Sequence, residues 1–395
     1  MKKLLLVALL IIGIAVIPGF YKNSGDVVLA GIDNNALNQI SGKTLSKQFN
    51  VKPGQKLYID MRTGASIQIE GWDKDLLTAD VDARGRSADD IDFDFKQTSD
   101  GVEITSEYAG DNDNSSDVEI ILKVPSKFDV EYETMGGDVK INNVDGKLEG
   151  RTMGGELILS NLKGMLNMTT MGGKIELTDS DVDGRVETMG GSVLVQDVTG
   201  DIDAKSMGGN VVQKNVKGRT GKSSGKEVRI TTMGGNLDLD DAPNGAYLKT
   251  MGGDINVNSV KKYLEAETMG GEINVQSIDG KIKAKTMGGD VDVKMTGNPD
   301  EGDRSVTLTS MGGDITLSVP ANLSMSFDIE IAYTRKGEDR ARIESDFKMN
   351  EEHSKEWDYN HGSKRKYIYG TGEVNGGKNK IRIRTVNGTV TIKKI

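Results

Sequence analysis

The residues of this chain whose type and spacing could support chemistry are ten methionines, each within a Thr/Ser-Met-Gly-Gly tetrapeptide. Seven of the nine intervals between them are 18 residues long, and the other two are 26 and 24 residues. Thioether sulfur is a soft ligand that suits Cu(I), and it can be oxidised reversibly. Methionine is also a flexible apolar side chain that fills irregular spaces, and we expect this packing role at the corners of the fold rather than a metal site. The ten residues are Met135, Met153, Met171, Met189, Met207, Met233, Met251, Met269, Met287 and Met311.

A second candidate site is the residue that follows each Gly-Gly pair. Stacked carboxylates could bind Ca²⁺ or act in pairs, as in glycoside hydrolysis. Lysine, serine and asparagine interrupt the column, and only Trp72 and Trp357 could offer large stacking platforms to a sugar. We therefore predict a solvated outer face that discourages pairing with other sheets. The positions are Asp138, Glu156, Lys174, Ser192, Asn210, Asn236, Asp254, Glu272, Asp290 and Asp314.

Three further motifs do not complete a site. Residues 111–117 begin like a calcium loop but lack its glycine and its final glutamate, so we expect a polar hairpin loop. Gly221-Lys222-Ser223 resembles a phosphate loop without the required first glycine or a following helix. The only histidines, His353 and His361, lie in a charged segment, where we expect them to be solvated. We therefore predict no catalytic, cofactor-binding or metal-binding residue, no cofactor and no enzyme activity.

The 18-residue period predicts the elements that carry these residues. In the unit from 269 to 287, Ile273 and Val275 alternate with polar residues, and a second alternating run follows Asp279-Gly280. This is the pattern of half-buried strands. One unit has too few apolar side chains for a core of its own, so the units must stack. We predict an all-β fold, a right-handed single-stranded parallel β-helix, or solenoid, with coils of about 18 residues.

Glycine pairs are expected to form the corners of each coil. The Gly-Gly pair suits a sharp corner because glycine adopts positive φ without steric penalty and lets backbones approach closely. Two units are longer than the rest, and their extra residues, around 218–225 and 297–302, are polar and rich in turn residues, so we expect loops there. A second corner is predicted at the Asp-Gly and Lys-Gly pairs 145–146, 163–164, 183–184 and 279–280.

The N-terminal residues 1–30 are predicted to be a signal peptide. Two lysines precede an apolar run from Leu4 to Ile17, which is short for a helix that spans a membrane. The sequence before Gly31 offers a cleavage site after Ala30, and an uncleaved anchor is the alternative.

After the predicted signal peptide, the chain divides into three segments. We predict an N-terminal β cap with irregular coils at 31–133, regular β-helix repeats at 134–318, and a C-terminal β cap at 319–395. The ends of a solenoid expose strand edges and core, so atypical caps are expected there. Degenerate versions of the corner sequence occur at Thr63-Gly64 and at 385–388.

Composition excludes several classes of protein. Cysteine is absent, which excludes disulfides, thiolate metal sites and lipid attachment to a cysteine. The formal net charge of −10 argues against binding to nucleic acid or to an anionic membrane surface. Membrane contact is expected only if the N-terminal segment is retained as an anchor.

The opening at residues 63–73, the Val-Pro step at 124–125 and repeats of the form Met-Gly-Gly-Asp-Ile-x-Val resemble the bacterial putative-adhesin family, a domain of unknown function. The resemblance covers roughly residues 43–395. It implies a β-helix on an exported protein and supplies no catalytic residues. Glycine-rich β repeats also resemble bactofilins, which polymerise in the cytoplasm, but the signal sequence argues against that family.

We therefore predict a non-enzymatic protein of the cell envelope, exported to the periplasm, the cell surface or the medium. It would be a monomer that binds a surface, a glycan or an envelope protein through its flat faces. The first alternative is a self-assembling envelope scaffold, against which the capped ends argue. The second is a polysaccharide-active enzyme, against which the few aromatic residues and the lack of acid/base pairs argue.

Overall fold

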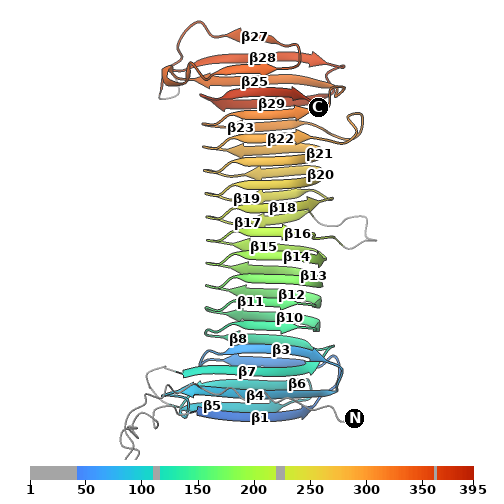
Figure 1. The fold of residues 1–395 in the computed structure, drawn as a ribbon, viewed down its shortest axis with the longest axis vertical. Coiled ribbons are helices and arrows are strands. Elements are labelled where there is room, and N and C mark those ends of the chain that lie inside the picture. The colour runs from blue at the N-terminus through green and yellow to red at the C-terminus, as the bar shows by residue number, and fades with distance from the viewer. Residues whose placement is uncertain (1–41, 110–115, 219–226, 360–362) are drawn as a thin grey trace, which may run out of the picture. The chain divides into compact units, whose positions relative to one another are not determined.

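The computed structural model describes residues 42–109, 116–218, 227–359 and 363–395 (Figure 1). The prediction of an all-β fold is confirmed, because the described residues form strands and one 3-10 turn, η1 (Arg335–Gly337). No helix among them is long and apolar enough to cross a membrane.

Stacked coils make up the central part of the fold. Most units contribute two strands, while β13, β20 and β21 each run through a whole unit, and each strand pairs in parallel with the strand one unit further along the chain. Leu148 lies opposite Leu166, and Leu157 lies opposite Ile175. The strands are β8 (Asp129–Thr134), β9 (Val139–Asn142), β10 (Asp145–Thr152), β11 (Leu157–Ser160), β12 (Lys163–Thr170), β13 (Ile175–Thr188), β14 (Val193–Thr199), β15 (Ile202–Ser206), β16 (Val211–Lys214), β17 (Val228–Thr231), β18 (Leu237–Ala242), β19 (Ala246–Lys249), β20 (Ile255–Glu267), β21 (Ile273–Thr286), β22 (Val291–Met295), β23 (Val306–Ser310) and β24 (Ile315–Val319).

The core runs along the inside of this stack. Alternate residues of each strand point inward, and the register places an apolar residue of one coil on an apolar residue of the next. Ile255, Ile273 and Val291 form one such column, and each is at most 1% exposed. Each coil therefore completes the core of its neighbours, as expected for a repeat that cannot fold alone.

Of the two reasons that we predicted for the Gly-Gly corner, the close approach of backbones is confirmed. Within these pairs, positive φ occurs at Gly137 (φ 95°) and not at the others, so the expectation of positive φ is wrong at nine of the ten corners. The second glycine is needed because the coils approach so closely. A β-carbon on Gly155 would lie 1.9 Å from the carbonyl oxygen of Gly137, whereas one on Gly154 would meet no atom within 4 Å.

The second corner also differs from the prediction. The Asp-Gly and Lys-Gly pairs do not form it: Asp145 begins β10, and Gly164 lies within β12. In five coils the backbone instead enters the left-handed region at an asparagine or aspartate, whose short polar side chain tolerates it, and the first two of these residues stand two positions before a predicted pair. These residues are Asn143 (φ 61°), Asn161 (φ 53°), Asp179 (φ 50°), Asp197 (φ 54°) and Asn215 (φ 49°).

One of the two predicted loops can be assessed. Residues 297–302 form a loop between β22 and β23, as expected, and the buried Arg304 holds it in place. The Arg304 guanidinium donates to the carbonyl oxygens of Thr296 (2.6 Å) and Glu301 (3.0 Å) and to the carboxylate of Asp279 (2.5 Å). The other loop, at 218–225, lies outside the described residues except for Gly218.

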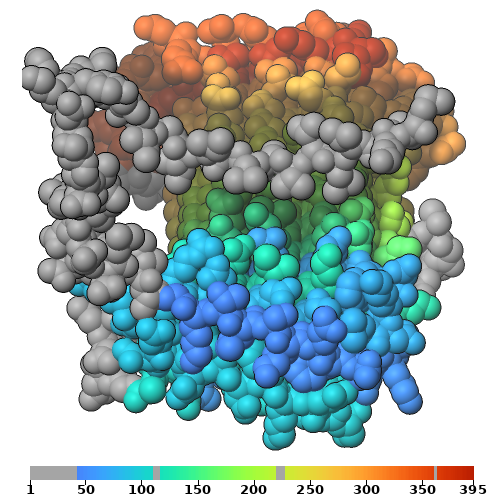
Figure 2. Space-filling model, turned by 60° about the horizontal axis from the view of Figure 1, so that its bottom comes forward, coloured from blue at the N-terminus to red at the C-terminus, as the bar shows by residue number. Residues whose placement is uncertain are grey.

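At the N-terminal end, antiparallel strands cover the stack, and their side chains form the blue and cyan surface in Figure 2. β1 pairs antiparallel with β4, β4 with β7 and β5 with β6, while β2 and β3 pair in parallel with β8 and β9. The strands are β1 (Gly42–Asn50), β2 (Lys56–Met61), β3 (Ser66–Trp72), β4 (Leu76–Gly85), β5 (Ile91–Gln97), β6 (Gly101–Tyr108) and β7 (Ser116–Pro125).

The C-terminal end has a similar arrangement. β29 and β30 continue the parallel stack on β23 and β24, and β25 lies on β29 and pairs antiparallel with β28. The segment 385–388 is a true coil corner, because the Thr385 hydroxyl donates to the carbonyl oxygen of Gly313 (2.6 Å). The strands are β25 (Met325–Tyr333), β26 (Arg342–Ser345), β27 (Asn350–His353), β28 (Lys366–Val374), β29 (Asn379–Val386) and β30 (Thr389–Lys394).

The two glycines of one corner should differ in their tolerance of a side chain. We expect Gly155→Ala to destabilise the protein by about 1–3 kcal/mol, the usual cost of overpacking, because its β-carbon would collide with the carbonyl of Gly137. Gly154→Ala is the matched control and should be close to neutral. Urea denaturation of both variants would test this, and equal midpoints would contradict the close-approach explanation.

Removal of residues 320–395 should cause aggregation. The truncation would uncover the unpaired edges of β23 and β24 and the buried side chains Leu308, Ile315 and Leu317, and exposed strand edges promote association. Sedimentation velocity on residues 40–319 and 40–395 would measure the difference. A truncated protein that stays soluble and monodisperse would show that β29 and β30 are not needed to cover the stack.

Candidate functional site

The threonine or serine that precedes each methionine is a buried residue that the sequence analysis did not single out. The Thr188 hydroxyl donates to the carbonyl oxygen of Gly173 in the previous coil (2.8 Å) and accepts from the amide of Gly191 in its own coil (3.2 Å). Nine further residues at this position are buried in the same way. The sequence did contain a signal for this role, because a threonine or serine precedes the methionine in every repeat. These side chains are Thr134, Thr152, Thr170, Ser206, Thr232, Thr250, Thr268, Thr286 and Ser310.

The methionines of the repeat do not pack inside the corner, so our prediction of a packing role is wrong. Nine of the ten are exposed, from Met153 at 40% to Met135 at 60%. The tenth, Met171, is half-buried, and its Sδ lies 3.9 Å from the Arg151 guanidinium. The threonine and glycine residues satisfy the backbone at the corner, and the methionine side chains extend outward from it.

The residues that follow the Gly-Gly pairs connect neighbouring coils. The carboxylate of Asp138 accepts a hydrogen bond from the backbone amide of Glu156 (2.8 Å), and Asn236 does the same for Asp254 (2.8 Å). Lys174 forms an ion pair with Glu156 instead (3.4 Å). A short side chain with an acceptor oxygen at this position therefore joins two neighbouring coils through a hydrogen bond. Within the described ranges, no group of three or more His, Cys, Asp or Glu residues is placed to hold a metal ion.

The remaining motifs contribute little to a site. Most of residues 111–117, the segment 221–223 and His361 lie outside the described residues. His353 ends β27, is exposed, and has its Nε2 2.6 Å from Glu351 Oε1. The structure therefore does not bring the two histidines into a described site.

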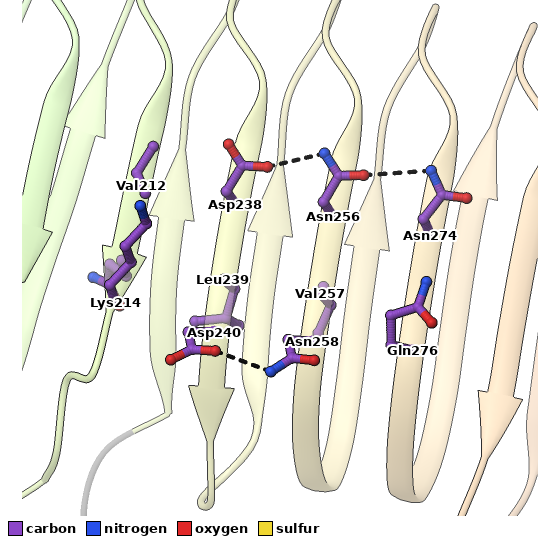
Figure 3. Close-up of a pocket in the computed structure, with 11 residues that line it drawn as sticks. Val212, Lys214, Asp238, Leu239, Asp240, Asn256, Val257, Asn258, Asn274 and Gln276 are labelled. Carbon is purple, nitrogen blue, oxygen red and sulfur yellow. Dashed lines mark hydrogen bonds between the residues drawn. The ribbon is translucent and has the colours of Figure 1, made fainter.

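A shallow groove of about 390 Å³ crosses the outer face of β16, β18, β20 and β21 (Figure 3). Amide and carboxylate side chains line it in two rows. In one row, Asn256 Nδ2 donates to Asp238 Oδ1 (2.9 Å), and Asn274 Nδ2 donates to Asn256 Oδ1 (3.3 Å). In the other row, Asn258 Nδ2 donates to Asp240 Oδ1 (3.0 Å). Polar groups thus recur at the spacing of the coils.

Gln213 is an unusual lining residue of this groove. It is 2% exposed, and it occupies the core column in which Val195 and Leu239 precede and follow it. Among the described residues its Oε1 has no hydrogen-bond partner. A buried polar atom without a partner is costly. Because Gln213 lies in the core column, this atom is not presented to a ligand on the outer face.

Aromatic residues gather at the C-terminal end, where the sequence analysis saw only their scarcity. Tyr367 and Tyr369 stack with ring centroids 5.9 Å apart, and Tyr333 meets the edge of Trp357 at 6.1 Å. Burial is the main cause that raises the pKa of both Tyr367 and Tyr369, so both stay protonated at neutral pH. The antiparallel pairing of β25 with β28 brings these distant residues together, and no local sequence pattern indicates it.

The family model for Toastrack DUF4097 matches residues 54–393, which include every coil of the stack. The chain belongs to this family. Membership in Toastrack confirms the resemblance to the putative-adhesin family that the corner repeats suggested. None of the curated proteins matches the sequence.

Three solved structures similar to this Toastrack chain share 10–15% sequence identity with it. One, described as a putative cell adhesion protein from Clostridium sporogenes, has 10% identity, with 90% of this chain and 100% of that chain covered and a TM-score of 0.19. A putative adhesin from Bacteroides fragilis has 15% identity, coverage of 62% and 97%, and a TM-score of 0.28. A putative adhesin from Parabacteroides distasonis has 14% identity, coverage of 70% and 98%, and a TM-score of 0.31. At this level of similarity these proteins do not define the function of the Toastrack chain.

The buried threonine column should contribute to stability through its hydroxyl groups. Thr188→Val keeps the shape of the side chain but leaves the Gly173 carbonyl and the Gly191 amide without this partner, so we expect a loss of about 1–3 kcal/mol. Thr188→Ser keeps both bonds and loses one methyl group, at a cost of about 1 kcal/mol. Chemical denaturation would rank the two variants, and a serine variant less stable than the valine variant would contradict this role.

Proposed function

We propose that this chain is a non-enzymatic, exported protein of the cell envelope that binds a hydroxyl-rich polymer, a glycan, along the groove on β16, β18, β20 and β21. The observation that carries the proposal is the pair of polar rows along this groove, which includes Asp238, Asn256 and Asn274. Amide and carboxylate groups can donate to and accept from sugar hydroxyls at the same time.

The form of the groove supports an extended ligand. Pockets for small molecules are concave and enclose most of their ligand, whereas this groove is shallow and open across several coils. Neighbouring strands lie about 4.8 Å apart, so the same polar group recurs at a short, regular interval. A polymer with repeated hydroxyl groups can contact several coils at once, and weak contacts then add together.

A second candidate, a polysaccharide-active enzyme, would depend on Asp238 and Asp240. Residues two apart on one face of a strand are separated by about 6.8 Å, which is within the range of the two carboxyl groups in inverting glycosidases. Each of these carboxylates accepts a hydrogen bond from an asparagine of the next coil, and they lie on an open face, not in a closed cleft. This environment favours binding over catalysis.

Other features of the chain belong to the same proposal. Parallel pairing and the handedness preference of parallel crossovers support a right-handed parallel β-helix. A signal peptide at 1–30, a cap at 31–133, repeats at 134–318, a second cap at 319–395 and a monomeric state remain proposals that rest on the sequence. A self-assembling scaffold is disfavoured because the described ends carry antiparallel strands.

Replacement of the groove amides should weaken glycan binding by about tenfold or more. The variant Asn256→Ala, Asn258→Ala, Asn274→Ala loses three hydrogen-bonding groups, each worth about 0.5–1.5 kcal/mol. The matched control, Asp292→Ala, Thr316→Ala, Ser318→Ala, removes three polar groups from the same outer face in the next two coils. A panel of glycans and envelope polymers would first identify the ligand, and titration would then compare the variants.

Equal affinity of the groove variant and the control would place the binding surface elsewhere on the protein. Release of shortened saccharides from a bound polymer, abolished by Asp238→Asn or Asp240→Asn, would establish the enzyme instead. An absence of binding to every polymer in the panel would contradict the proposed ligand class.

A further inference from the structure

We propose that the exposed methionines form a binding row for soft monovalent cations of the Cu(I) type, with each ion held between the sulfurs of two adjacent coils. The row consists of the ten methionines of the Thr/Ser-Met-Gly-Gly repeat, from Met135 to Met311, and is called the methionine row below. This site is separate from the groove, and the inference does not depend on the proposed glycan ligand.

The methionine row does not pack in the core of the fold. The second glycine of each corner makes the close backbone approach, and the threonine or serine hydroxyl joins the coils, as Gly155 and Thr188 illustrate. The methionine side chains lie outside the core, and nine of ten are at least 40% exposed. Exposed apolar side chains at such a position add little to stability, so a packing requirement does not account for them.

Comparison of the units within the chain shows that the methionine is nevertheless retained. Three residues further along the chain, the exposed or half-buried position after each Gly-Gly pair has diverged to aspartate, glutamate, lysine, serine and asparagine. The methionine position carries the same residue in all ten Thr/Ser-Met-Gly-Gly units, and it is valine, Val386, in the last corner at 385–388. Repeats that have diverged at one exposed position and not at another indicate a function for the unchanged residue beyond the structure of the corner.

The register places the methionines on consecutive coils. The amide of Met251 donates to the carbonyl oxygen of Met233 (3.2 Å), and the amide of Met269 donates to that of Met251 (3.2 Å). Met207 and Met233 are 26 residues apart in the sequence but lie on adjacent coils, because the Met233 amide donates to the Met207 carbonyl (3.3 Å). The row therefore continues past the inserted residues.

The spacing of the coils suits a two-coordinate ion. Neighbouring strands are about 4.8 Å apart, and two bonds of the length found between zinc and a cysteine sulfur, about 2.3 Å each, would span about 4.6 Å. Flexible methionine side chains can make the small adjustment. Thioethers are neutral and soft, which favours Cu(I) over hard divalent cations. Glycines follow each methionine and present no side chain, so the sulfurs are accessible along the row.

One pair should bind more weakly than the others. The Arg151 guanidinium lies 3.9 Å from Met171 Sδ, and its positive charge opposes a bound cation at that sulfur.

Two variants with equal numbers of sulfurs test the bridging arrangement. The alternating variant replaces Met153, Met189, Met233, Met269 and Met311 with leucine, so no two remaining methionines of the row are adjacent. The block variant replaces Met135, Met153, Met171, Met189 and Met207 with leucine, so the five that remain are all adjacent. Leucine preserves the apolar character, and because these side chains lie outside the core the fold should be retained, which circular dichroism would check.

Anaerobic titration of the full chain with Cu(I), in competition with a chromophoric Cu(I) chelator, would measure affinity and stoichiometry. Ten sulfurs taken two at a time allow up to five ions in the unaltered chain. We expect the block variant to keep its affinity with a reduced stoichiometry and the alternating variant to bind at least tenfold more weakly. Met165→Leu is the control, because Met165 is 56% exposed on β12 but lies outside the row; it should bind like the unaltered chain.

Equal binding by the alternating and block variants would overturn the bridging arrangement. No competition with the chelator by the unaltered chain would overturn the site as a whole. Neither result would affect the groove, whose amides are unchanged in these variants, so the two proposals can fail independently.

Discussion

Neighbouring coils approach each other so closely at the Met-Gly-Gly corner that a single added β-carbon would not fit between them. The β-carbon that Gly155 lacks would lie 1.9 Å from the Gly137 carbonyl oxygen, and Gly173 has the same relation to Gly155 at 2.1 Å. This contact fixes the register of each coil on the last. The buried threonine hydroxyls, the carboxylates that accept amides of the next coil, and the apolar columns of the core all require that register. A shift by one residue would turn the inward side chains outward.

The sequence predicted the parts of this arrangement that depend on the period. Alternation of Ile273 and Val275 with polar residues indicated strands, and the 18-residue interval indicated which strands pair. The direction of the methionine side chains was predicted wrongly, because a corner interrupts the alternation that distinguishes inside from outside. Of the two reasons given for the glycines, the close approach of backbones holds, whereas positive φ holds only at Gly137. The sequence could not show which glycine of a pair makes the approach, because the contact is with the backbone of a different coil.

The candidate surfaces were harder to predict than the fold. The groove requires knowledge of which outward residues lie beside one another across coils, such as Asn256 beside Asp238 and Asn274. The aromatic cluster requires the antiparallel pairing of β25 with β28, which joins Tyr333 to the neighbourhood of Trp357 and Tyr367. Stacking therefore determines both the fold and its surfaces, because it converts residues that recur along the chain into rows in space. In such a protein, binding surfaces are expected along faces and edges, with cooperation between identical positions.

The order of the last strands has a consequence for how the chain is made. β29 and β30 are formed from the final residues, yet they lie between the coil of β23 and β24 and the earlier strands β25 and β26. During synthesis or export that begins at the N-terminus, β25 and β26 emerge before the layer on which they pack exists. They must wait until Asn379–Lys394 arrives, and only then can this end of the protein close. The cover at this end of the stack can therefore assemble only once β29 and β30 are present.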